Sequence, residues 1–572
     1  MTATRRSVLK SITLTLGVAS VPGAAGATPA AREPWWQRAV GYQVYPASFA
    51  DSNGDGTGDI PGIIAHLDHL RDLGIGFIWL SPVYASPMVD NGYDISDYQA
   101  INPRFGTLAD IDRLIAEARR RGIGIVMDLV VNHTSDQHAW FKAARADPKS
   151  PYRDYYLWRD TAPAKGAPDD FGGVFGGSSW TRDEAAGAYY FHMFAPQQPD
   201  LNWANPALRQ DIYKMMNWWL DRGVAGFRMD VIDLIGKDIP RGITSDGPNL
   251  HRYLQEMTAA TRHGRDVVTV GEAWSATPDT GPLYSDPARH ELSMLFQFEQ
   301  VTKFWDAKLG KWKPKPFDLA VLKAAFAKWQ AALATRGWNS LFWSNHDLPR
   351  AVSRYGDPGE HRVASAKMLA TVLHLMKGTP YIFQGEEIGM TNAGFTTIDQ
   401  YRDLETINFH KIQLADGVSE ADFMAGARAN SRDNARTPMQ WTGGRGAGFT
   451  SGTPWIAVNA NYRSVNVAAD RANPAGVFER YRRLIALRHA LPIIRHGNFE
   501  LIAPDHPAVF AYQRRLGRQR LLVIANFTGA PTSLELAADQ RISGRDLLAG
   551  GRRTVAGAVP LAPYQTIVVL AG

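Results

Sequence analysis

The sequence predicts a (β/α)8 TIM barrel with an inserted subdomain after its third strand and a C-terminal antiparallel β domain. Short apolar runs alternate with longer amphipathic segments in units of roughly 30 to 40 residues, which is typical of βαβ crossovers and a parallel sheet. Eight such runs occur, which is the number of strands in this barrel. Several of the apolar runs end in polar residues. These positions correspond to the carboxyl ends of the strands, where barrels of this kind place their functional groups.

The elements follow one another in a regular order. Strands are expected at 41–49 and 75–83 with a helix at 60–74 between them, and a second helix at 108–122 precedes the third strand at 123–133. The remaining strands are expected at 224–232, 266–274, 294–301, 340–347 and 378–387, before a last helix near 476–491. A doubly wound open sheet is the alternative, but no Gly-rich phosphate loop follows the first strand.

Two stretches interrupt or follow this alternation. Residues 133–200 are aromatic and Gly-rich, so we interpret them as the inserted subdomain between two barrel parts, 35–132 and 201–490. The tail at 491–572 consists of short apolar runs separated by turns, which predicts a separate antiparallel β domain.

Composition describes an ordinary globular chain of 572 residues, with 45% hydrophobic and 21% charged residues. The formal charge of +6 is spread thinly, so we expect no nucleic-acid partner.

Residues 1–27 combine Arg5 and Arg6 with an apolar run and small residues, which indicates a twin-arginine signal peptide and a periplasmic or secreted protein. An uncleaved anchor is the alternative; after cleavage we expect no stable membrane association. With no cysteine, disulfides are excluded.

Three carboxylates follow three different predicted strands, namely Asp230, Glu272 and Asp347. Arg228 with Asp230 could be a structural ion pair, or Arg228 could hold a reactive carboxylate ionised. Two carboxyl groups facing a glycosidic bond suffice for its hydrolysis, one as acid and one as nucleophile or base. Asp230 suits the ionised role, and Glu272, among apolar neighbours, suits the acid.

Four motifs carry a resemblance to a known family. "DLVVNH", "GFRMD", "GEAW" and "FWSNHD", in this order, resemble the four sequence regions of the α-amylase family of glycoside hydrolases. "DSNGDGTGDI", "PDLNWANP", "LFQFE" and "SRDNARTPMQW" narrow the resemblance to oligosaccharide α-glucosidases of the oligo-1,6-glucosidase type. The resemblance extends from Trp35 to the end of the chain.

The resemblance implies a role for each matching residue. Asp230 would be the nucleophile of a retaining mechanism, Glu272 the general acid/base and Asp347 the stabiliser of the transition state. The residues that would bind the terminal glucose of a small oligosaccharide are Asp90, Tyr93, His133, Arg228, His346 and one of Arg432 and Arg436, between which the sequence does not choose. An Asp/Arg floor makes a pocket, which implies exo-action from the non-reducing end.

Val231 bears on the bond that is cleaved. In the family, Val directly after the nucleophile accompanies a preference for α-1,6 links. The simpler interpretation is that Val231 only packs inside the barrel. A sucrose isomerase or transglucosylase of the same fold is the alternative function. Sucrose isomerases carry Thr after the nucleophile and an R-L-D-R-D loop, both of which this chain lacks. A non-catalytic protein of this fold would have lost carboxylates that this chain keeps.

The loop "DSNGDGTGD" places oxygen ligands at alternate positions. They are Asp51, Asn53, Asp55, the backbone carbonyl of Thr57, and Asp59, which resembles a calcium loop. Gly62 stands where an EF-hand has its bidentate Glu, so we expect a single structural calcium ion. A polar turn without an ion is the alternative.

Overall fold

The eight predicted strands form one parallel sheet that closes into a barrel. The computed structural model describes residues 33–262 and 264–572, so the signal peptide predicted at 1–27 lies outside the described residues. In spatial order the strands are β11 (Met294–Phe296), β10 (Val268–Glu272), β9 (Gly226–Met229), β5 (Gly124–Leu129), β2 (Phe77–Leu80), β1 (Gly41–Val44), β15 (Thr379–Phe383) and β14 (Ser340–Leu341). A parallel bridge between Leu295 and Asn339 joins the two ends. The predicted fold class is confirmed.

Helices follow most of the strands, as the crossovers of a parallel barrel require. They include α4 (Leu108–Arg120), α6 (Pro206–Arg222), α7 (Leu250–Thr261), α8 (Gly281–Ser285), α10 (Leu319–Ala332), α12 (Arg362–His374) and α17 (Val477–Ala490). The helix expected at 60–74 is two shorter ones, α2 (Ile60–Ala65) and α3 (Leu67–Leu73). They separate at His66, whose backbone N–H bonds Ile63 O and whose ring bonds Gly62 O.

Gly226, which opens the strand of the predicted nucleophile, has a backbone that other residues rarely adopt. Its φ is +150°, and a Cβ placed there would lie 1.8 Å from the carbonyl oxygen of Val268 on β10. A side chain would therefore force β9 and β10 apart. This glycine thus fixes the spacing of the strands that end at Asp230 and Glu272.

The inserted subdomain lies between β5 and α6. It holds α5 (Ala139–Ala146) and an antiparallel sheet in the order β6 (Trp158–Arg159), β8 (Ala188–Phe191), β7 (Trp180–Asp183). An antiparallel bridge between His133 and Asp200 joins the two chain segments at its base. The subdomain is therefore anchored beside the end of β5.

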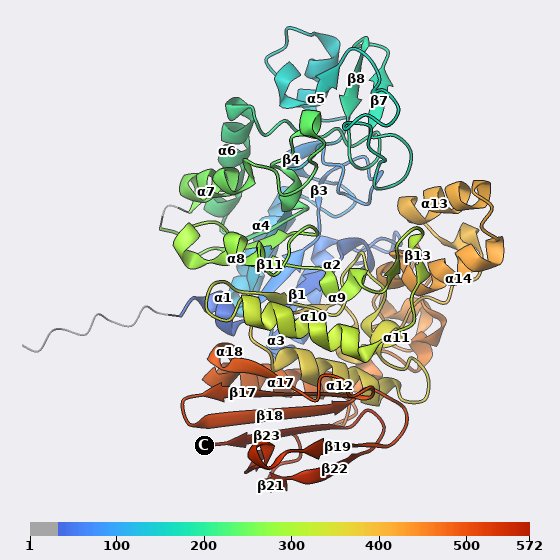
Figure 1. Cartoon of the computed structure of the whole chain (residues 1–572). Coiled ribbons are helices and arrows are strands. Elements are labelled where there is room, and N and C mark those ends of the chain that lie inside the picture. The colour runs from blue at the N-terminus through green and yellow to red at the C-terminus, as the bar shows by residue number, and fades with distance from the viewer. Residues whose placement is uncertain (1–32, 263) are drawn as a thin grey trace, which may run out of the picture. The chain divides into compact units, whose positions relative to one another are not determined.

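Two further insertions were not predicted. A hairpin of β12 (Trp305–Asp306) and β13 (Gly310–Pro314) follows β11, and the helices α13 (Leu404–Ala415) and α14 (Glu420–Asn430) follow β15 (Figure 1). Both insertions leave the barrel at the carboxyl ends of strands. They therefore lie on the side where the predicted catalytic residues gather.

The C-terminal region is antiparallel, as predicted. Its larger sheet has the order β16 (Asn498–Ile502), β17 (Val509–Leu516), β18 (Gln519–Asn526), β23 (Thr566–Ala571), β20 (Ile542–Asp546), β21 (Arg552–Val555), and β19 (Thr532–Leu536) pairs with β22 (Gly557–Leu561). Apolar side chains of both sheets share one buried cluster. Within residues 33–262 and 264–572, none of the helices is long and apolar enough to span a bilayer.

Candidate active site

Arg228 holds three carboxylates at the carboxyl ends of neighbouring strands. Its Nη1 lies 2.8 Å from both Asp128 Oδ1 and Asp230 Oδ1, and its Nη2 lies 2.5 Å from Glu272 Oε2. The indole ring of Trp79 lies 4.7 Å from the guanidinium carbon. A single cation therefore bridges the predicted nucleophile and the predicted acid. Asp128 was missed because it sits inside an apolar run.

Burial dominates the pKa shifts of the two carboxyls that are predicted to be catalytic. It raises the pKa of Asp230 well above its usual value; Arg228 opposes the rise, and Glu272 adds to it. Burial also raises the pKa of Glu272, again against Arg228, with Asp347 adding to the rise. Arg228 thus acts on the pKa of Asp230 in the expected direction, but burial outweighs it, so the net shift is upward. A raised pKa suits Glu272 as an acid.

Val231 has a strained backbone between these two carboxylates. Its φ of 35° and ψ of 46° lie in the left-handed region, which costs a β-branched residue about 1 to 3 kcal/mol. In this conformation its backbone N–H donates to Glu272 Oε2 at 3.1 Å. The turn after β9 thereby fixes the orientation of the predicted acid.

Asp347 lies against two guanidinium groups and an imidazole. Its Oδ1 is 2.9 Å from Arg436 Nη2 and 3.4 Å from Arg432 Nη1, and its Oδ2 is 3.2 Å from His346 Nε2. Burial alone would raise the pKa of Asp347, but His346, Arg432 and Arg436 outweigh it and hold the pKa below its usual range. Asp347 is therefore negatively charged at neutral pH.

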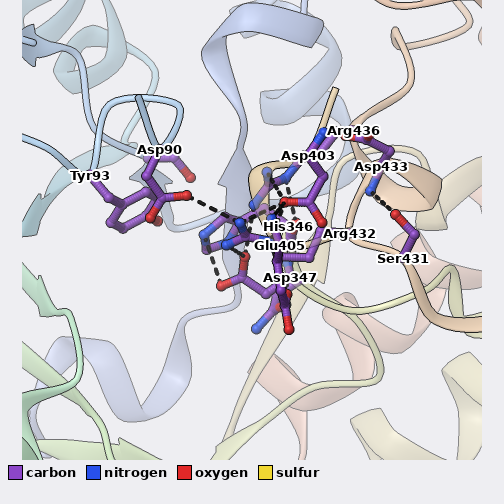
Figure 2. Close-up of polar contacts among 12 residues, drawn as sticks. Asp90, Tyr93, His346, Asp347, Asp403, Glu405, Ser431, Arg432, Asp433 and Arg436 are labelled. Carbon is purple, nitrogen blue, oxygen red and sulfur yellow. Dashed lines mark hydrogen bonds and ion pairs between the residues drawn. The ribbon is translucent and has the colours of Figure 1, made fainter. Parts of the chain in front are cut away.

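The structure distinguishes the two arginines that the sequence left open. Figure 2 shows Arg432 between Asp90 and Asp403, with Nη2 3.1 Å from Asp90 Oδ1 and 2.6 Å from Asp403 Oδ1. Arg436 instead donates to the carbonyl oxygen of His346 at 3.0 Å. Arg432 thus forms the Asp/Arg pair, and Arg436 lies behind Asp347.

Tyr93, His133 and His346 lie together near these carboxylates. The Tyr93 ring stacks on His346 with centroids 5.2 Å apart, and its hydroxyl donates to Asp128 at 3.0 Å. His133 Nε2 lies 3.1 Å from the carbonyl oxygen of Tyr93. Burial lowers the pKa of His133 to about 4 and that of His346 to about 3, so both rings are neutral near pH 7.

A cavity of about 530 Å³ lies beside this cluster. Its charged and polar lining includes Asp90, Tyr93, His133, Asp230, Glu272, Asp347 and Arg432. Arg228, His346 and Arg436 are not among the described residues that line it. The aromatic part of its lining was not predicted: Phe175 and Phe194 come from the inserted subdomain, Trp305 and Trp312 from the β12–β13 hairpin, Phe409 from α13, and Trp274 follows the end of β10. The cavity therefore has a charged floor and aromatic walls.

A buried lysine joins the inserted subdomain to the barrel. Lys237 Nζ lies 2.6 Å from Asp200 Oδ2 and 2.6 Å from Asn132 Oδ1. The salt bridge ties the loop after β9 to the end of the subdomain, beside His133. The sequence analysis missed this contact because the partners lie far apart along the chain.

The loop predicted to bind calcium forms a compact set of hydrogen bonds. Asp51 Oδ1 accepts the N–H groups of Asn53 and Gly54 at 3.0 and 2.7 Å, and Asp59 Oδ1 caps α2 through Gly62 N at 2.6 Å. No group of three or more His, Asp or Glu side chains within the described ranges is arranged around a metal position. The donors are nonetheless all oxygens, and no ion pair neutralises Asp51, Asp55 or Asp59 within residues 33–262 and 264–572. This chemistry suits a hard cation.

Comparison with known proteins identifies the family. The alpha-amylase catalytic domain matches residues 43–497, and the alpha-amylase SusG C-terminal domain matches residues 509–568. The chain belongs to the α-amylase family of glycoside hydrolases. Its catalytic domain carries the three carboxylates at the strand ends described above.

Similar proteins narrow the family further. Palatinase of Erwinia rhapontici is 54% identical over 94% of this chain and 98% of its own length. An oligo-1,6-glucosidase of Halalkalibacterium halodurans is 51% identical over 90% of this chain and 94% of its own. The crystal structure of isomaltulose synthase from Klebsiella sp. LX3 is 40% identical with a TM-score of 0.90, covering 94% of this chain and 100% of that one. The chain is thus an oligo-1,6-glucosidase-like glycoside hydrolase.

Proposed function

We propose that this glycoside hydrolase is a retaining, exo-acting α-glucosidase that cleaves short α-glucosides from the non-reducing end and prefers α-1,6 links. The contact between Asp90 and Arg432 is the observation that carries the exo-acting part. The two side chains lie 3.1 Å apart and line the cavity together with Asp347. In this proposal the pair closes the floor of the cavity. A closed floor accommodates a chain end, whereas an open groove would accommodate the middle of a chain.

In this proposal each of the three carboxylates has one role in a two-step displacement. Asp230 attacks the anomeric carbon while Glu272 donates a proton to the leaving glycosidic oxygen. Glu272 then takes a proton from water as that water displaces the glucosyl group from Asp230. The charged Asp347 stabilises the positive charge that develops on the ring. Neutral His133 and His346 are suited to hydrogen-bond glucose hydroxyls.

Two observations support preference for α-1,6 links. Val231 lines the cavity next to Asp230 and presents no hydroxyl to the aglycone, the part of the substrate beyond the cleaved bond. Relatives named palatinase and oligo-1,6-glucosidase are 54% and 51% identical to this chain. Palatinose, like isomaltose, is an α-1,6-linked glucoside.

Isomerisation of sucrose is the second candidate, and the similarity to isomaltulose synthase favours it. In that reaction the glucosyl group would pass from Asp230 to a fructose hydroxyl instead of to water. Val231 and the absence of an R-L-D-R-D sequence argue for hydrolysis.

One experiment separates these functions. The purified protein is incubated separately with isomaltose, palatinose, maltose, sucrose and trehalose, and the products are identified by chromatography. We expect glucose from isomaltose and palatinose at the highest efficiency. Sucrose converted mainly to another disaccharide would establish isomerisation instead, and release of glucose from maltose alone would overturn the linkage preference.

We also propose a structural calcium ion and export. Asp51, Asn53, Asp55, Asp59 and the carbonyl of Thr57 would hold the ion, which would add positive charge to an acidic loop. Residues 1–27 would direct the protein through the twin-arginine route to the periplasm or the medium. N-terminal sequencing of the exported protein tests the second proposal, and a start at the initiator methionine would contradict it.

A further inference from the structure

Gln43 on β1 contacts the histidine that precedes Asp347. Its Nε2 lies 2.8 Å from His346 Nδ1 and donates to the hydroxyl oxygen of Ser81 at 3.1 Å. Gln43 is only 1% exposed, and His346 is fully buried. The two hydrogens of the amide NH2 group are thus directed to two acceptors, one on the ring and one on Ser81. The first strand of the barrel thereby reaches one specific nitrogen of the His346 ring.

Aromatic neighbours fix the plane of the His346 ring. Tyr93 stacks on it with an interplanar angle of 7°, and Tyr45 stacks on it at 22° with centroids 6.1 Å apart. Trp79 meets the ring edge-on at 5.7 Å. The ring therefore presents Nδ1 to Gln43, while its Nε2 lies 3.2 Å from Asp347 Oδ2.

Only one of these two nitrogens carries a proton. Burial lowers the pKa of His346 to about 3, so the ring is neutral near pH 7. The negative charge of Asp347 favours a proton on the nearer nitrogen, Nε2. Nε2 has no hydrogen bond of standard geometry within residues 33–262 and 264–572, however, so Asp347 alone holds the proton there only weakly. The hydrogen bond at Nδ1 is the second influence, because the partner of one ring nitrogen sets the tautomer at the other.

We propose that Gln43 is a positioning residue: by donating to His346 Nδ1 it keeps the ring proton on Nε2, beside Asp347 Oδ2. An amide oxygen in the same place would draw the proton to Nδ1 and leave the Nε2 lone pair against the carboxylate. That repulsion would displace Asp347, which lines the cavity. The inference rests on the proposed function, because it takes Asp347 as the group that stabilises the charge of the transition state.

The position of the ring proton can be measured in the wild-type protein. Histidine labelled with nitrogen-15 gives separate NMR resonances for protonated and bare ring nitrogens, and the pair missing from His346→Phe belongs to His346. Near pH 7 we expect a protonated Nε2 and a bare Nδ1. A ring protonated on Nδ1, or on both nitrogens, overturns the proposal.

Gln43→Met keeps the length of the side chain and removes the donor. We expect the two resonances of His346 to move toward each other, as in a mixture of both tautomers. We also expect kcat for the best-cleaved disaccharide to fall at least about tenfold and KM to change less than about threefold, because Asp347 acts in the transition state. Melting curves verify folding, and Gln43→Leu takes the place of Gln43→Met if the latter is unfolded.

A double-mutant cycle shows whether Gln43 acts through His346. In the His346→Phe protein the ring nitrogens are already absent, so the addition of Gln43→Met should lower kcat no further. A role of Gln43 in packing alone would instead lower kcat by the same factor in both proteins. Equal factors overturn the proposal.

Gln384→Met is the matched control. Gln384 follows β15, is also buried, and donates its backbone N–H to the carbonyl oxygen of Gln43 at 3.1 Å. Its side chain accepts the backbone N–H of Tyr45 at 2.8 Å and donates to the carbonyl oxygen of Ser48 at 3.2 Å. This substitution should lower the melting temperature while the ring proton of His346 stays on Nε2.

The remaining outcomes are distinct. A folded Gln43→Met protein with unchanged His346 resonances, or with kcat within about threefold of wild type, overturns the proposal. Failure of the proposed function appears separately, as an Asp347→Asn protein with wild-type kcat. The resonances of His346 in the wild-type and Gln43→Met proteins would then decide the role of Gln43 by themselves.

Discussion

The backbone N–H of Val231 donates to Glu272 Oε2 at 3.1 Å, and Arg228 Nη2 lies 2.5 Å from the same oxygen. Both groups are donors, so Oε2 can only accept. A proton on Glu272 must therefore reside on Oε1, which leaves that oxygen to donate to a substrate. The left-handed turn at Val231 is what brings its N–H to this position. The residue after the proposed nucleophile thus orients the proposed acid through its backbone.

Removal of either carboxylate that is proposed to be catalytic should abolish most activity without unfolding the protein. We expect Asp230→Asn and Glu272→Gln each to lower kcat by several orders of magnitude, because each removes a group that acts in the transition state. Initial rates with isomaltose and far-UV circular dichroism measure the two effects. Glu535→Gln, an exposed site on β19, is the control. A folded Asp230→Asn protein with near wild-type turnover would refute the mechanism.

The glucose released should appear first as the α anomer. Displacement through a glucosyl-Asp230 intermediate inverts the anomeric centre twice and so retains its configuration. A proton NMR time course during hydrolysis of isomaltose shows which anomer forms before mutarotation. If β-glucose forms first, water attacks directly and Asp230 is not a nucleophile.

The barrel could be predicted because its strands are continuous apolar runs, each closed by polar residues such as Asp230 and Glu272. The aromatic walls could not be predicted. Phe175, Trp312 and Phe409 come from three insertions that lie far apart in the sequence and meet only in the fold. Arg432 and Arg436 lie one turn apart at one short helix, so only the folded contacts distinguish them.

Glu386 should make stability depend on pH. Burial raises the pKa of Glu386 to about 7, although Ser344 and Arg350 oppose the rise. Because this pKa exceeds the unfolded value, the stabilising effect is fully present below the unfolded pKa and is lost as pH rises through about 7. From pH 5 to pH 8 the loss is about 2 to 3 kcal/mol.

Glu386→Gln removes this titration while it can retain the contacts with Ser344 and Tyr481. The melting temperature of the variant relative to wild type should therefore rise between pH 5 and pH 8. Thermal melts at both pH values measure the difference, and Glu535→Gln should show no such trend. A difference that is constant with pH would mean that Glu386 does not titrate in this range.

Chelation should lower the melting temperature without abolishing turnover. A calcium ion held by Asp51, Asn53, Asp55 and Asp59 stabilises the native state by mass action, whereas the proposed reaction needs no metal. Melting curves and activity are compared in excess EDTA and after calcium is restored. Asp55→Asn should reduce the response to EDTA. Unchanged melting in EDTA, together with no metal in elemental analysis, would exclude the site.

Val231→Thr should shift linkage preference toward α-1,4 bonds. The Val231 side chain lines the cavity beside Asp230 and is only 8% exposed, so its shape narrows the path to the aglycone side. The extra exocyclic carbon of an α-1,6 link lets the aglycone swing clear of this side chain, whereas an α-1,4-linked sugar lies closer to it and finds no hydroxyl there. Such shape discrimination is worth about 1 to 3 kcal/mol, or roughly 10- to 200-fold in relative efficiency.

We therefore expect wild-type protein to cleave isomaltose more efficiently than maltose, and Val231→Thr to move the ratio of the two kcat/KM values toward maltose. Threonine keeps the β-branch, so the strained φ of 35° and the N–H contact with Glu272 should survive. Val231→Ile, which adds a methylene and no hydroxyl, is the matched control and should keep the preference for isomaltose. A wild-type protein that prefers maltose tenfold would show that Val231 does not set the linkage, and its role would then be the one its backbone performs toward Glu272.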